Sequence, residues 1–134
     1  MTCSACGDTT VPVSVPEEYR EHAPAESARV SCCTNCLRVA PNEEAEADDG
    51  EEPDFSRISD AFPTASSRAV PLVLAMHLCS SLATNKRAIE SLLREVERAG
   101  TDPLLTIDRL AADPELEPAI DLDRRRHQLE QLLY

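Results

Sequence analysis

Two short segments, CSACG at residues 3–7 and CTNCL at residues 33–37, each contain a pair of cysteines on which the fold of this chain depends. Each segment holds two cysteines separated by two residues, a spacing with which one tight turn can present two thiolates to the same ion. Zinc in structural sites takes four tetrahedral ligands and accepts thiolates readily. The predicted ligands of one structural Zn²⁺ are Cys3, Cys6, Cys33 and Cys36.

The turns around such a metal need a residue that tolerates positive φ just after the second thiolate. Gly7 fills that position in the first segment without a Cβ penalty. Leu37 fills it in the second, so we expect a less regular turn there. The 26 residues between the two pairs exceed the usual spacing of about 15–20, which leaves room for a β-hairpin.

Other uses of the cysteines stay open. Six cysteines could form a disulfide framework in a secreted chain, and four thiolates also suit an iron–sulfur cluster. Met1 is followed by neither a basic nor an apolar run, so we expect a cytoplasmic chain with reduced thiols. Cys32, next to Cys33, is a competing ligand for the metal if its side chain points the same way. We expect it to point to the opposite face of a strand instead. We expect Cys79 to be a core residue.

The residues between the cysteine pairs predict strands. Residues 11–15 alternate apolar and small side chains, and Pro12 requires that strand to lie at a sheet edge or to be irregular. Residues 16–27 predict a turn or long loop, and residues 28–32 predict the returning strand. We therefore expect a zinc ribbon, a short hairpin held by two cysteine turns, within residues 1–40.

Residues 41–54 contain eight acids and no base, which predicts an acidic, disordered linker. Residues 55–134 predict a small helical bundle whose central helix is the apolar run 69–79, too short to span a membrane. The sequence thus predicts an α+β chain in three parts: ribbon 1–40, linker 41–54 and helical domain 55–134.

Local signals place the ends of the helices. Ser66 or Ser67 is the expected N-cap of the central helix, and Pro71 requires that helix to begin within a turn of it. Thr84 or Asn85 is expected to cap the next helix. That helix should end at Gly100. Its apolar positions form one stripe: Ala88, Ile89, Leu92, Leu93, Val96 and Ala99. Asp102 with Pro103, and then Asp121, predict the starts of two more helices.

The charge balance disfavours nucleic acid as a partner. The formal net charge is −12, and lysine occurs once among thirteen basic residues, a composition that favours a salt-adapted cytoplasm. High salt weakens phosphate contacts, and the four aromatic residues are too few for a base-stacking platform. Arg124, Arg125 and Arg126 lie among acids, so we expect a solvated, self-paired helix face.

No enzymatic chemistry is expected. The three glycines are isolated and form no phosphate loop, and neither a His-Glu-x-x-His nor a Gly-x-Ser-x-Gly motif occurs. A catalytic zinc keeps one coordination position open, whereas four thiolates close it.

The knuckles CSACG and CTNCLRV resemble those of small, uncharacterised zinc-ribbon proteins of halophilic archaea, which have paired CxxC or CPxCG-type knuckles. The resemblance covers residues 1–40 and implies zinc on the same four cysteines in a small regulator or adaptor. Ser4 and Leu37 depart from the pattern, where proline and glycine are common. We therefore expect a zinc-binding adaptor with a protein partner and no membrane; the alternatives are a nucleic-acid-binding transcription factor and a thiol redox switch.

Overall fold

The computed structural model describes residues 3–42 and 54–133, which form a three-stranded antiparallel sheet followed by helices. The strands are β1 (Thr10–Ser14), β2 (Arg29–Cys33) and β3 (Val39–Pro41), in the spatial order β1-β2-β3. Pro12 therefore lies on an edge strand as predicted, opposite Ser31. The predicted α+β fold is confirmed.

Short 3₁₀ helices occupy the connections. Between β1 and β2 lie η1 (Glu17–His22) and η2 (Pro24–Glu26), where the sequence predicts only a turn or long loop. After residues 43–53, which lie outside the described part, comes η3 (Phe55–Arg57). Asp54 caps η3 by accepting a hydrogen bond from the Ser56 amide.

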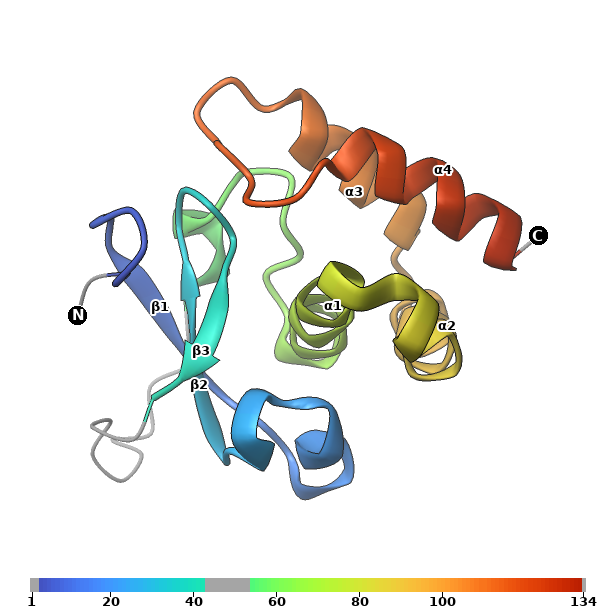
Figure 1. The fold of residues 1–134 in the computed structure, drawn as a ribbon, viewed down its shortest axis with the longest axis horizontal. Coiled ribbons are helices and arrows are strands. Elements are labelled where there is room, and N and C mark those ends of the chain that lie inside the picture. Colours follow the sequence, from blue (N-terminus) through green and yellow to red (C-terminus); the bar gives the residue numbers. More distant parts are fainter. Residues whose placement is uncertain (1–2, 43–53, 134) are drawn as a thin grey trace.

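In the described part of the chain, four α-helices complete the fold (Figure 1). They are α1 (Ser66–Leu78), α2 (Leu82–Arg98), α3 (Pro103–Ala112) and α4 (Leu122–Leu133), with η4 (Cys79–Ser81) joining the first two. Helices α1 and α2 pack side by side, and α4 packs on α3. Along the described residues, none of the helices is long and apolar enough to cross a membrane.

The predicted caps at the start of the two long helices are wrong. The N-cap of α1 is Ala65, so Ser66 and Ser67 lie inside the helix and Pro71 is several residues from its start. The apolar residues from Ala69 to Met76 are all buried, and that burial outweighs the hydrogen bond that Pro71 cannot make.

Helix α2 likewise begins at Leu82, before the predicted caps Thr84 and Asn85. Asn85 has non-helical φ and ψ of −111° and 18°. Its side-chain amide donates to the carbonyls of Leu78 and Ser81 at 3.3 and 3.1 Å. Asn85 therefore stabilises the bend between α1 and α2 rather than a helix start.

The later helix signals are confirmed. Four positions of the α2 stripe are fully buried: Ile89, Leu92, Leu93 and Val96. Gly100 ends the helix with φ of +103°. Asp102 accepts a hydrogen bond from the Leu105 amide, with Pro103 at the first turn of α3. Asp121 accepts one from the Arg124 amide at the start of α4.

One hydrophobic cluster joins the sheet to the helices. Val11 and Val13 alternate with exposed residues along β1, and their buried side chains belong to the same cluster as Leu72 and Leu92. The predicted division at residues 40 and 54 stays a prediction. The ends of the predicted linker are structured, since Pro41 is in β3 and Asp54 caps η3. Residues 43–53 lie outside the described part.

Candidate metal centre

The two turns rich in cysteine lie together at one end of the sheet and bring the four predicted ligands into one cluster. The Sγ atoms of Cys3, Cys6, Cys33 and Cys36 all lie within 4.8 Å of one another. Sγ of Cys36 is 3.8 Å from Sγ of Cys3 and 3.8 Å from Sγ of Cys6, and the Cys6–Cys33 separation is 3.3 Å. These distances exceed the S–S bond length of a disulfide, which is about 2.05 Å, and all four thiols are free.

The separations fit a tetrahedral ion. A Zn–S bond of about 2.3 Å places neighbouring sulfurs of a tetrahedron about 3.8 Å apart. Two of the three Sγ separations given above have this length, and the Cys6–Cys33 separation is shorter. Four cysteines at this spacing can hold a metal ion.

The two turns share one geometry and lie thirty residues apart in the sequence. Cys33 follows Cys3 by 30 positions, and Cys36 follows Cys6 by 30 positions. The Cys3 amide donates to the Asp8 carbonyl at 2.7 Å, and the Cys33 amide donates to the Arg38 carbonyl at 2.9 Å. We call these turns the first knuckle (residues 3–8) and the second knuckle (residues 33–38).

The knuckles are also joined to each other. The Thr34 amide donates to the Thr9 carbonyl at 3.0 Å, and the Thr34 hydroxyl donates to the same carbonyl at 2.9 Å. These bonds extend the β1–β2 pairing of Thr10 with Cys33. The sheet therefore sets the distance between the two cysteine pairs.

Backbone amides donate hydrogen bonds to some of the sulfurs. The amides of Asn35 and Cys36 both donate to Sγ of Cys33 at 3.4 Å. In the first knuckle, hydrogen bonds from the backbone of Cys6 and Ala5 lower the pKa of Cys3 to about 6. Amides directed at sulfur favour the thiolate that a metal requires.

Burial acts against the thiolate in the second knuckle. It raises the pKa of Cys33 and raises that of Cys36 to about 12. Buried, closely spaced thiolates repel one another, so a cation at the centre of the cluster would be needed to keep all four sulfurs deprotonated at neutral pH. The donor set thus fits a divalent metal that binds thiolates.

The remaining cysteines lie in the hydrophobic core, as predicted. The side chain of Cys32 is 2% exposed, and its Sγ contacts the Cys33 carbonyl at 3.8 Å. Strand β2 directs consecutive side chains to opposite faces, so Cys33 faces the cluster and Cys32 faces the core. Burial raises the pKa of Cys32 to about 12 and that of Cys79 to about 11.

The second turn, predicted to be less regular because Leu37 replaces glycine, has the same left-handed backbone at Leu37 as the first turn has at Gly7. The φ of Leu37 is +64°, and that of Gly7 is +82°. A left-handed conformation costs a residue with a Cβ about 1–2 kcal/mol. The Leu37 side chain is only 7% exposed and belongs to the core cluster. The second knuckle therefore keeps a strained residue whose side chain packs into the interior.

The connection between α3 and α4 contacts the second knuckle directly. The Glu117 amide donates to the Asn35 carbonyl at 3.0 Å, and the Ala119 amide donates to the Cys36 carbonyl at 2.9 Å. Figure 1 shows this connection passing beside the tip of the β2–β3 hairpin. These two residues could not be predicted from the sequence, because no side-chain pattern marks a backbone contact.

A cavity of about 360 Å³ lies at the same junction. Its walls come from the second knuckle, the end of α1 and the start of α4, and they include Leu37, Met76, Ile120 and Leu122. His77 also lines it, and burial lowers the pKa of this histidine.

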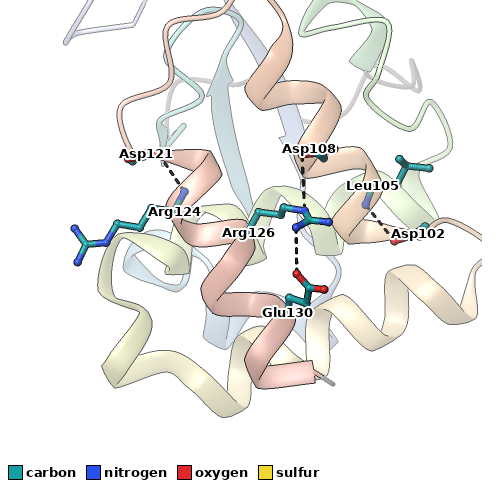
Figure 2. A network of polar contacts seen from close by, with 7 residues as sticks. All are labelled: Asp102, Leu105, Asp108, Asp121, Arg124, Arg126 and Glu130. Atoms are coloured by element: carbon teal, nitrogen blue, oxygen red, sulfur yellow. Dashed lines mark hydrogen bonds and ion pairs between the residues drawn. The ribbon is translucent and has the colours of Figure 1, made fainter.

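The triple arginine is largely paired, as predicted. The Arg126 guanidinium contacts Asp108 on α3 at 3.7 Å and Glu130 on α4 at 3.1 Å (Figure 2). Arg125 donates to the side chain of Gln128 at 2.9 Å. The Arg124 side chain extends away from this network in Figure 2.

The paired knuckles on a three-stranded sheet fit a zinc-ribbon-like protein. Comparison with family models assigns the chain more narrowly: it belongs to the family described as "Family of unknown function (DUF6276)", which matches residues 2–133. Searches of curated proteins and of solved structures found no match.

Proposed function

We propose that this chain is a small zinc-binding adaptor or regulator in which a structural Zn²⁺ on the four clustered cysteines supports a surface for a protein partner. The observation that carries the proposal is the convergence of four sulfurs within 4.8 Å in two knuckles of matching geometry. Structural zinc contributes about 10–16 kcal/mol of apparent binding free energy, much of it as folding free energy.

A non-catalytic role is part of the proposal. Four thiolates fill the coordination sphere of zinc and leave no position for substrate or water. The two alternatives have less support. Nucleic-acid binding is opposed by the net charge of −12 and by the ion pairs of Arg126. A redox switch at Cys32 is opposed by the burial of that thiol, because oxidants attack exposed thiolates.

The first test is the metal content of protein purified in high salt, which suits a salt-adapted chain. We expect one zinc per chain by mass spectrometry, lost in Cys3→Ser and Cys36→Ser but retained in Cys79→Ser. Protein with no metal, or with disulfides among these cysteines, would contradict the proposal.

The second test addresses the partner. We expect crosslinking in native extract to recover a specific protein with the wild type and not with the Cys36→Ser variant. Recovery of the same proteins by both forms would argue against a role for the metal-supported surface. A mobility shift of DNA or RNA at the same salt concentration would favour the transcription-factor alternative instead.

A further inference from the structure

Backbone carbonyls of the second knuckle contact a segment that is distant in sequence, residues 117–120. The acceptors of the Glu117 and Ala119 amides are the carbonyls of Asn35, inside the knuckle, and of Cys36, a predicted ligand. The side chains of Glu117 and Ala119 are exposed. Attachment of this stretch to the knuckle therefore depends on the direction of two carbonyl groups.

The metal would fix that direction. The Cys36 carbonyl belongs to the peptide unit between Cys36 and Leu37, and φ of Leu37 sets how this unit is oriented relative to the residues that follow. A leucine relaxes readily from φ of +64° to negative φ when nothing restrains it. Binding of both knuckle sulfurs to one ion and burial of the Leu37 side chain together supply the restraint, so loss of the ion would let the Cys36 carbonyl turn away from Ala119.

Apart from the two hydrogen bonds to the knuckle, the partly buried Ile120 packs against the hydrophobic cluster, and further contacts hold the segment at its two ends. Before it, Leu116 is buried and the Ser59 hydroxyl donates to Asp113 at 2.7 Å. After it, Leu122 is buried at the start of α4. Within residues 117–120, the backbone hydrogen bonds found among the described residues are the two to the second knuckle. Release from the knuckle would therefore loosen this stretch without unfolding α2.

We propose that the second knuckle is a metal-dependent clasp for residues 117–120 and that removal of the metal frees them. The proposal rests on the metal binding proposed above. Because Ala119, Ile120 and Leu37 line the cavity at this junction, their separation would open it and expose apolar surface. Metal occupancy would thus control a surface formed by residues far from the cysteines in the sequence.

Hydrogen exchange of single amides, followed by NMR, tests the clasp on the full chain with zinc and after treatment with EDTA. We expect exchange at Glu117 and Ala119 to accelerate at least tenfold on zinc removal. The Ala99 amide, which donates to Glu95 at 3.0 Å at the end of α2, is the internal control and should change much less. Equal acceleration at Ala99, or unchanged exchange at Glu117 and Ala119, would overturn the proposal.

A variant tests the clasp without altering a thiol. Leu37→Ala should retain zinc yet raise exchange at Glu117 and Ala119 severalfold. Leu82→Ala is the matched control, because Leu82 is 8% exposed against 7% for Leu37 and lies at the start of α2. If both variants behave alike at these two amides, the clasp is wrong. Mass spectrometry separates the cases: protein without metal contradicts the proposed function, whereas zinc-loaded protein with unresponsive amides contradicts the clasp alone.

Discussion

Gly7 and Leu37 occupy equivalent positions in the two knuckles, thirty residues apart, and both have a left-handed backbone, with φ of +82° and +64°. The glycine adopts this conformation without steric cost, whereas the leucine does not. The Leu37 side chain is buried in the cluster that joins the sheet to the helices. The second knuckle therefore combines a metal turn with a packing contact, and the first does not.

Replacing Leu37 with glycine should destabilise the zinc-loaded protein even though glycine suits the backbone. Loss of a buried leucine side chain costs about 2–5 kcal/mol, and relief of the left-handed strain returns about 1–2 kcal/mol. We expect the free energy of unfolding in urea to fall by about 1–3 kcal/mol. A Leu37→Gly variant as stable as the wild type would show that packing at this position is unimportant.

The companion variant Gly7→Ala isolates the backbone effect. A Cβ at Gly7 would meet nothing within 4 Å. Any decrease in the free energy of unfolding therefore comes from the backbone φ of +82°. We expect a loss of about 1–2 kcal/mol in the same urea experiment. Zinc stoichiometry should be unchanged in both variants.

Cys32 and Cys33 should respond oppositely to substitution although they are neighbours. Cys32→Ala should retain zinc, with a modest loss of stability from a small core cavity. Cys33→Ala should lose zinc, because it removes one of the four clustered sulfurs. Metal content by mass spectrometry and thermal unfolding with and without added zinc distinguish the two. Zinc loss in Cys32→Ala would place Cys32 among the ligands.

His77 should make stability depend on pH. Burial lowers its pKa in the folded state, so below the unfolded value of about 6.5 the unfolded chain takes up a proton that the folded chain resists. The contribution of neutral His77 is thus present above that pH and lost as the pH falls toward 5. Urea unfolding at pH 7.5 and 5.5 should show a smaller change for His77→Gln than for the wild type.

The matched control for this experiment is His127→Gln. His127 lies in α4, is exposed and does not line the cavity, so its variant controls for the loss of a histidine elsewhere on the helices. Zinc release at low pH is common to all three proteins and cancels in the comparison. Equal pH dependence in all three would remove the assigned role of His77.

Arg126 should contribute modestly to the packing of α4 on α3. Its guanidinium lies between Asp108 and Glu130, whose side chains are 53% and 51% exposed. Exposed pairs contribute about 0.2–1 kcal/mol, and salt screens them. Arg126→Ala should therefore lower stability by up to about 1 kcal/mol at low salt, with a smaller loss at high salt, measured by urea unfolding. Arg124→Ala is the control and should be neutral; equal losses would rule out a specific bridge.

Much of this fold could be predicted because its signals are local. Two cysteines at a spacing of two residues form a knuckle within one turn, and the alternation of Val11 and Val13 marks a strand with one buried face. Gly100 and Asp102 act on neighbouring backbone groups, so their effects are also local. The starts of α1 and α2 could not be predicted, because burial of apolar residues around Pro71 and Leu82 overrode the nearby capping residues.

The two cysteine pairs and the turn residue Gly7 are evident from the residues alone, because ligand chemistry and backbone freedom belong to single residues and their neighbours. Burial of Leu37 against the helices and the hydrogen bonds from Glu117 and Ala119 to the second knuckle are evident only in the folded chain. Every residue except proline carries the same amide and carbonyl. A backbone contact between distant segments therefore leaves no mark in the side chains, and it forms only when the packed core brings those segments together.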